Sequence, residues 1–493
     1  MSALKKALSV LLTVVVWLCT LTACGEKYKD AYIYFELLQK PQTLDPQTAS
    51  SDSELLIVRN IYEGLLRKNA SGEIVNGAIE SYTYSGLTYT FKLKDNLCWS
   101  DGTELTANDF EYGFRRAVDP RINAPFASRL KNISGAEAVM SGSADVSTLA
   151  VNAVDKYTFQ VTMCREDAEF TDTLTTSVCM PCNEEFFENS IGKYGLDAEC
   201  IISNGSYRLA KWNKEDFGIR LYKNEKYNGE FDSQNAAVFI SCVEDEAQYL
   251  RLLDGDSDMA LLPCNELQKA NEQGLRTASV ENICWLMTVK SEYSPQVRQA
   301  FAKAFSTNIY SNSLPDGFKA AKSIYPQILN INTENIGITE YNLTESKAIM
   351  SAQISAMKDG KFPSAVMYYY KTDCVDNIAT AIVGHWQQNL STFINIKEID
   401  NLSAIQNEIS NSTLDFALFP VTAKSSSFYE YASVFSEVAI ADTPDGLQQL
   451  LLKDNLIIPV AFQNTNISYI PTLENVIMED GNGYIDFSFI IKK

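Results

Sequence analysis

The chain has 493 residues, which is too long for one compact core and predicts two or three domains. Its composition, 46% hydrophobic and 21% charged, is that of an ordinary globular protein and excludes both a disordered chain and a polytopic membrane protein. The formal net charge of −21 at pH 7, without a local basic stripe, argues against nucleic acid as a partner.

The N-terminus resembles the export signal of a bacterial lipoprotein. Two lysines precede an apolar run over 7–18, which is too short to span a membrane stably. The segment Leu-Thr-Ala-Cys that ends at Cys24 resembles a lipobox, where cleavage precedes a cysteine that becomes diacylated. We therefore predict a signal peptide over 1–23, a lipid tether over 24–29 and attachment to the outer face of the cytoplasmic membrane. A plain secretory signal with an incidental cysteine is the alternative.

The cysteines do not form a recognisable metal or redox motif. Eleven are present, and the loss of Cys19 with the signal and the lipidation of Cys24 leave nine. An odd number in an exported protein means that at least one thiol is free or paired between molecules. The "CMPC" segment at 179–182 is a lone C-x-x-C without nearby histidines, so we interpret its cysteines as structural. We expect no metal and no cofactor.

Apolar periodicity predicts the elements in chain order. A strand over 31–35 precedes a turn-rich loop, and a helix over 53–66 follows it. Alternating apolar residues over 87–93 indicate a half-buried strand. Later elements are two strands within 204–227, a helix over 297–306, a strand over 362–370 and a strand over 455–470.

The segment "LKDNLCWSDGTELTANDFEYGFRRAVDP" (93–120) contains charged and aromatic groups that each have a structural explanation. Gly102 suits a tight turn after the strand. Thr106 is a helix N-cap with Asp109 at the third helical position, as in a capping box. Arg115 and Arg116 lie in the last turns, where positive charge suits the helix dipole. No base or nucleophile stands beside them, so the pattern does not indicate catalysis.

Several segments in this order resemble the family 5 extracellular solute-binding proteins, which are the peptide- and dipeptide-binding lipoproteins of ABC importers. The segments are "LDP" (44–46), "IYEGLLR" (61–67), "YTFKLKDNLCWSDGTELTANDFEYGFRRAVDP" (89–120), "NGSYRLAKW" (204–212), "LYKNEKY" (221–227) and "VRQAFAKAF" (297–305). The resemblance is clear from residue 31 to about residue 305 and weaker beyond it.

The resemblance implies an α/β, two-lobed periplasmic-binding-protein-like fold (type II, Venus-flytrap) with an extra satellite domain in lobe one. On this sequence the domains map as lobe I over 30–68, 200–278 and 461–493, the satellite over 69–199, and lobe II over 279–460. It also implies a monomer that encloses a peptide or other small solute between its lobes and docks on an ABC permease. Relatives typically hold an extended peptide through its backbone groups, much as a sheet accepts an added strand.

One segment departs from the family pattern. Many peptide-binding relatives carry an acidic residue, in a segment like "aDYpDP", that pairs with the amino terminus of the peptide. The corresponding segment here is 417–436, and it has Ala423, Lys424 and Ser425 where that acid is expected. The nearest carboxylates are Asp415 and Glu430. A peptide with a free amine is therefore not the obvious ligand, and Lys424 faces either an anionic group of the ligand or solvent.

We expect the ligand to meet three segments: 36–41 after the first strand, "CWLM" (284–287) and the divergent loop over 425–429. For Trp285 the buried core is an equal alternative. The candidate ligand-binding residues are Glu36, Leu37, Leu38, Trp285, Lys424, Ser425, Ser426 and Tyr429.

Three other functions remain open. The first is an enzyme, which the sequence does not favour, because the single histidine, His385, lies in an apolar helical pattern and no G-x-S-x-G or H-E-x-x-H motif is present. The enzyme alternative that remains is a hydrolase that cleaves envelope polymers with a pair of carboxylates. A binding protein for a sugar or a metal chelate is the second, although the scattered cysteines and His385 argue against a metal site. The third is a surface receptor that senses peptides without importing them.

Overall fold

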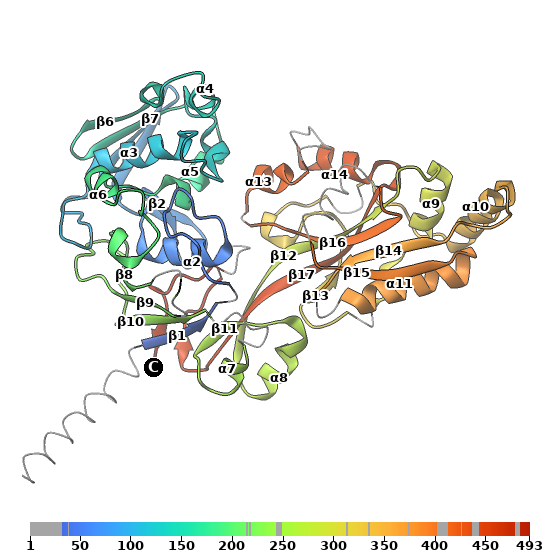
Figure 1. The fold of residues 1–493 in the computed structure, drawn as a ribbon. Coiled ribbons are helices and arrows are strands. Elements are labelled where there is room, and N and C mark those ends of the chain that lie inside the picture. Colours follow the sequence, from blue (N-terminus) through green and yellow to red (C-terminus); the bar gives the residue numbers. More distant parts are fainter. Residues whose placement is uncertain are drawn as a thin grey trace, which may run out of the picture. The chain divides into compact units, whose positions relative to one another are not determined.

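The computed structural model describes residues 32–37, 39–212, 215, 218–242, 249–311, 314–333, 336–372, 375–401, 413–424, 426–435, 443–478 and 484–493. The chain forms two compact units (Figure 1). Unit 1 comprises Met1–Ala260, Tyr469–Ile477 and Ile485–Lys493, and unit 2 comprises Leu261–Ser468 and Met478–Tyr484.

A mixed sheet is the base of unit 1. Strand β1 (Tyr32–Glu36) pairs in parallel with β10 (Ala237–Ser241) on one side and with β11 (Met259–Leu261) on the other. Strands β9 (Gly218–Lys223) and β8 (Tyr207–Lys211) continue from β10 in antiparallel order. The predicted first strand and the two predicted strands within 204–227 are thus confirmed.

Helix α2 (Asp52–Ile61) follows β1 and begins with a capping box between Ser51 and Glu54. It ends five residues before the predicted limit at Leu66. The carbonyl of Ile61 accepts the N–H of Gly205 at 2.9 Å, so it is engaged by a distant segment instead of continuing the helix. The chain then extends into β2 (Leu66–Lys68), which forms a hairpin with β3 (Ile74–Asn76).

A separate four-stranded antiparallel sheet in unit 1 has the order β4-β5-β7-β6. Its strands are β4 (Ile79–Ser85), β5 (Thr88–Leu93), β7 (Thr158–Thr162) and β6 (Val151–Asp155). Helix α3 (Ala107–Val118) packs on one face, where Phe114 lies 5.3 Å from the ring of Phe159. The predicted capping box between Thr106 and Asp109 is confirmed.

Short helices lie in the connections of unit 1, and its C-terminal segments form a two-stranded antiparallel pair. These elements are α4 (Ala136–Met140), α5 (Phe170–Thr173), α6 (Glu184–Asn189), α7 (Leu250–Leu253), β18 (Leu473–Glu474) and β19 (Ile491–Lys492).

Unit 2 contains a layer of strands with helices on both faces (Figure 1). Its strands are β12 (Arg276–Val289), β16 (Phe416–Thr422), β14 (Ala365–Tyr370), β15 (Ile394–Ile399), β17 (Ile457–Tyr469) and β13 (Phe318–Ala320). Its helices are α8 (Leu267–Glu272), α9 (Pro295–Lys303), α10 (Leu343–Ala356), α11 (Val375–Leu390), α13 (Phe428–Ser433) and α14 (Pro444–Leu452).

Alternation along β12 divides the interior of unit 2 into two cores. Trp285 and Met287 point to the side that α9 and α11 cover, together with Phe301 and Trp386. Their neighbour Leu286 points to the other side, which α13 and α14 cover. Burial on both faces explains why the second half of β12, over 283–289, and β16 are mostly apolar in the sequence.

Candidate functional site

Glu36 stands at the carboxyl end of the parallel strands of unit 1. It is the last residue of β1, and its register partners are Ser241 at the end of β10 and Ala260 on β11. In α/β sheets ligands bind beyond the carboxyl ends of the strands. The position of Glu36 therefore marks a candidate ligand-binding edge.

The carboxylate of Glu36 is buried but only partly compensated. The residue is 2% exposed, and its Oε1 lies 3.5 Å from Nε of Arg251. Among the described residues, Oε2 has no hydrogen-bond partner. Burial raises the pKa of Glu36 because it disfavours the charged form, while hydrogen bonding to Ser241 and the nearby Arg251 oppose the shift. The group can accept a further N–H from a ligand.

The other residues of the first predicted segment contribute less. Leu37 is buried, and its N–H donates to the carbonyl of Ser241 at 2.9 Å, which extends the pairing with β10 by one residue. Leu38 lies outside the described residues.

In unit 2, the C-terminal half of β16 has a sheet partner on one side only within the described part of the chain. Strand β14 pairs with β16 as far as Tyr369 opposite Leu418. On its other side, β16 is paired over its whole length with the second half of β12, from Val289 opposite Phe416 to Ile283 opposite Thr422. Residues 419–422 therefore present an open edge on the β14 side, and such an edge can accept an added strand.

The hydrogen bonds to β12 determine which backbone groups this edge offers. The N–H of Ala423 donates to Asn282 and the N–H of Lys290 donates to Asp415, so the odd-numbered residues of β16 face β12. Because backbone groups alternate along an antiparallel strand, Pro420 and Thr422 face the open edge. Proline has no N–H, so the edge offers two carbonyl oxygens and only one donor, the N–H of Thr422.

Lys424 follows this edge directly. It is partly exposed and forms no ion pair with any residue that the structure describes. Of the two carboxylates nearest to it in sequence, Asp415 precedes the opposite end of β16. It accepts hydrogen bonds from the hydroxyl of Tyr293 and the N–H of Val366, each at 2.9 Å. The side chain of Glu430 lies outside the described part of the chain.

The remaining residues of the predicted loop are only partly described. Ser426 is exposed. Ser425 and the side chain of Tyr429 lie outside the described residues, as does Cys24, the predicted lipidation site.

Trp285 belongs to the core of unit 2. It is 1% exposed, and its indole N–H donates to Oε1 of Gln463 at 2.7 Å. Of the two interpretations that the sequence left open, this position favours the buried core. Tryptophan in a core usually finds such a partner for its N–H.

The cysteines that the structure describes form no disulfide with one another. Burial raises the pKa of both Cys179 and Cys182 to about 12, so the thiols of the C-x-x-C segment stay protonated at neutral pH. Protonated thiols are poor nucleophiles, which supports their interpretation as structural residues.

Within the described ranges, no group of three His, Cys, Asp or Glu residues could hold a metal ion. None of the helices in these ranges combines the length and the apolar character that a membrane span requires.

Sequence reasoning missed the two features that define these edges. Arg251 and Ser241 lie far from Glu36 in the chain and show no motif. The open edge of β16 did leave a signal, because Pro420 interrupts an otherwise apolar strand pattern. A proline within a strand is found where its nitrogen faces no sheet partner.

Comparisons with known proteins agree with this architecture. Residues 73–440 match the bacterial extracellular solute-binding proteins, family 5 Middle. The chain is 25% identical to the oligopeptide-binding protein OppA of Bacillus subtilis over 430 residues, which is 81% of this chain and 78% of that protein. It is 32% identical to the probable deoxycholate-binding periplasmic protein YgiS of Escherichia coli over 238 residues, 46% of this chain and 43% of that protein.

A solved structure shows the same fold. The substrate-binding domain of an oligopeptide ABC transporter from Bacillus anthracis superposes with a TM-score of 0.73 at 21% identity, covering 94% of this chain and 99% of that one. This likeness confirms the predicted two-lobed α/β fold class. The proteins in these comparisons are binding proteins, not enzymes. The chain therefore belongs to family 5 of the bacterial extracellular solute-binding proteins.

Proposed function

We propose that this protein captures a peptide-like solute between its two lobes and delivers it to an ABC importer. Membership of the family and the oligopeptide-binding relative support the class of function. The observation that carries the ligand assignment is the open edge of β16 over residues 419–422. A sheet edge recognises an extended chain through backbone groups and tolerates many side chains.

Recognition at this edge begins with the backbone of the ligand. The N–H of Thr422 donates to a ligand carbonyl, and the carbonyls of Pro420 and Thr422 accept ligand N–H groups.

The ligand selects the closed form of the protein only by binding it more tightly than the open form. Closure is a hinge motion in which a few residues between the lobes absorb the backbone change.

Charged groups set the preference among ligands. We assign Lys424 to an anionic group of the ligand, a terminal or side-chain carboxylate, because it follows the open edge and has no ion-pair partner among the described residues. We assign Glu36, whose Oε2 has no partner there, to an N–H or ammonium of the ligand. A hydrogen bond to a charged group contributes about 1.5–3 kcal/mol.

A non-peptide anion is the second candidate. Lys424 stands where peptide-binding relatives carry an acid, and one relative is named for binding deoxycholate, which carries a carboxylate. Such a ligand would use Lys424 but not the backbone groups of the β16 edge.

A receptor that senses peptides without importing them would use the same site as the importer. Deletion of the gene separates import from sensing, because peptide uptake is lost only if the protein serves an importer.

Calorimetry with matched ligands tests the assignment. We expect trialanine to bind the wild-type protein, and its C-terminal amide to bind about tenfold more weakly because the amide cannot pair with Lys424. Lys424→Met should remove this difference, while Lys358→Met, which changes an exposed lysine elsewhere in unit 2, should preserve it. Binding of deoxycholate without any binding of tripeptides would refute the peptide assignment in favour of the second candidate.

We also propose that the protein is a monomer held at the outer face of the cytoplasmic membrane by lipid on Cys24. The lipobox-like segment before this residue supports the anchor. Cys24→Ala should release the protein into the soluble fraction and abolish metabolic labelling with palmitate. Retention of both properties in the variant would contradict the proposal.

A further inference from the structure

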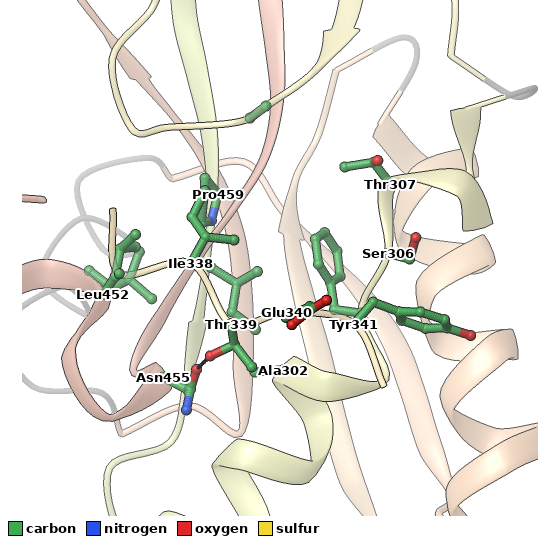
Figure 2. Close-up of a pocket in the computed structure, with 15 residues that line it drawn as sticks. Ala302, Ser306, Thr307, Ile338, Thr339, Glu340, Tyr341, Leu452, Asn455 and Pro459 are labelled. Carbon is green, nitrogen blue, oxygen red and sulfur yellow. Dashed lines mark hydrogen bonds between the residues drawn. The ribbon is translucent and has the colours of Figure 1, made fainter. Parts of the chain in front are cut away.

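Unit 2 contains a cavity that lies apart from the β16 edge. Its volume is about 220 Å³, and its walls come from the end of α9, the loop over 337–341 and the start of β17 (Figure 2). None of the lining residues belongs to 416–424. The cavity is therefore independent of the surface assigned above to the transported solute.

The floor of this cavity is apolar. Ala302, Phe305, Leu452 and Ile457 line it, and each is at most 9% exposed. A cavity of about 150 Å³ with Leu, Ile and Phe walls binds benzene, and drug-sized ligands need at least about 300 Å³. The volume here fits one ring or a branched alkyl group with a short arm.

The opening of the cavity carries a negative charge. Glu340 lines the cavity and is exposed, so its carboxylate lies at the mouth, between Thr339 and Tyr341 (Figure 2). It forms no ion pair with any described residue, and the nearby Lys303 is held by Glu345 at 2.8 Å. An apolar floor beneath an unpaired carboxylate matches a ligand with an apolar body and a cationic end.

The wall that carries Glu340 is tied at two points. The hydroxyl of Thr339 donates to Oδ1 of Asn455, as Figure 2 shows. The N–H of Asn342 donates to the carbonyl of Lys303 at the end of α9 at 2.9 Å. A wall that is already held in place loses little conformational freedom when a ligand enters.

We propose that this cavity is a second ligand site, which binds a small amphipathic amine with its apolar body against Phe305 and Leu452 and its ammonium at Glu340. The site is separate from the transported solute and does not depend on the proposed function. Because Glu340 is exposed, its contribution is modest and falls with added salt.

Ligand-observed NMR with three probes of one shape tests the proposal. Phenethylamine should bind about three- to fivefold more tightly than the neutral 2-phenylethanol, and 3-phenylpropionate should bind most weakly. Glu340→Gln should make the amine and the alcohol equal. Glu292→Gln, which removes an exposed carboxylate outside the cavity, should leave the preference for the amine intact.

Filling the cavity provides the second measurement. Ala302→Leu and, independently, Ile338→Phe should abolish binding of both phenethylamine and 2-phenylethanol. Two filling variants are used so that a folding defect in one, visible as a lower Tm, does not decide the result. The proposal is overturned if no probe binds, if the amine preference survives Glu340→Gln, or if both folded filling variants retain binding.

Discussion

Arg116 illustrates how much the environment of one residue differs from its sequence pattern. The sequence places it in the last turn of a helix, where it complements the dipole. In the structure it is 5% exposed, and its guanidinium donates to both carboxylate oxygens of Asp45 at 3.2 and 2.8 Å. It also lies 4.1 Å above the ring of Phe187. The "LDP" and "FRR" segments, which identify the family, are thus joined by a buried ion pair across 71 residues.

Breaking this buried pair should be costly. We expect Arg116→Met to lower the free energy of unfolding by about 3–5 kcal/mol, because Asp45 would remain buried without its counter-charge. Chemical denaturation measures the change. Arg121→Ala is the control, since Arg121 pairs with Asp119 but is 81% exposed, and its loss should change stability by about 0.5 kcal/mol or less. Equal effects of the two substitutions would contradict the role given to burial.

Asp109 should make stability depend on pH. Burial raises its pKa from 3.8 to about 6 by disfavouring the charged carboxylate, although hydrogen bonds from Thr106 oppose the shift. Between these two values the unfolded chain releases the proton while the folded chain keeps it, so stability falls as pH rises. The full difference is about 3 kcal/mol at 1.36 kcal/mol per unit.

The comparison with Asp109→Asn isolates this effect, because asparagine can still accept the N–H of Thr106 but does not titrate. Relative to that variant, the wild-type protein should lose about 3 kcal/mol of unfolding free energy between about pH 4 and pH 6. Parallel pH profiles of the two proteins, measured by denaturant titration, would show that Asp109 keeps an ordinary pKa.

At the scale of elements, local patterns predicted the strands and helices whose causes are local. The capping box of α3 and the alternation along β5 are examples, since each depends on residues within a few positions. The end of α2 was wrong because its cause is distant: Asn204 and Gly205 bind the backbone at 61–63. The open edge of β16 was missed for the same reason, because it depends on where β14 stops.

Asn204 should therefore stabilise the end of α2. Its side chain accepts the N–H of Glu63 at 3.1 Å and donates to the carbonyl of Glu63 at 2.8 Å, and it is buried. Asn204→Ala leaves both backbone groups without a partner and should cost about 2–3 kcal/mol in denaturation. Asn228→Ala, which removes a single exposed hydrogen bond to Asn96, should cost less than about 1 kcal/mol. A cost for Asn204→Ala as small as that would contradict this explanation.

Pro420 should limit what the β16 edge can bind. Pro420→Ala adds an N–H on the open side, so trialanine should bind about three- to tenfold more tightly in calorimetry. The fold should lose at most about 1 kcal/mol, because the nitrogen faces away from β12. The control Pro363→Ala changes an exposed proline outside the edge and should leave affinity unaltered. Unaltered or weaker binding by Pro420→Ala would place the ligand elsewhere.

At the scale of the whole molecule, the sequence predicted the family and the two-lobed fold class correctly, because several segments between residues 44 and 305 resemble the family in the same order. The domain limits, with a satellite over 69–199 and lobe II over 279–460, remain a proposal. The sequence named Glu36 as a candidate, but not the unpaired Oε2 of its carboxylate or the open edge of β16, because strands that meet only in the folded chain define both features.

The central claim is that this member of the family carries a peptide-like solute. Native mass spectrometry of the exported protein, purified from its own host without added ligand, tests it most directly. We expect adducts of several masses that are released on activation and fragment as peptides. A single non-peptide adduct, or an empty protein that no tripeptide library stabilises, would contradict the claim.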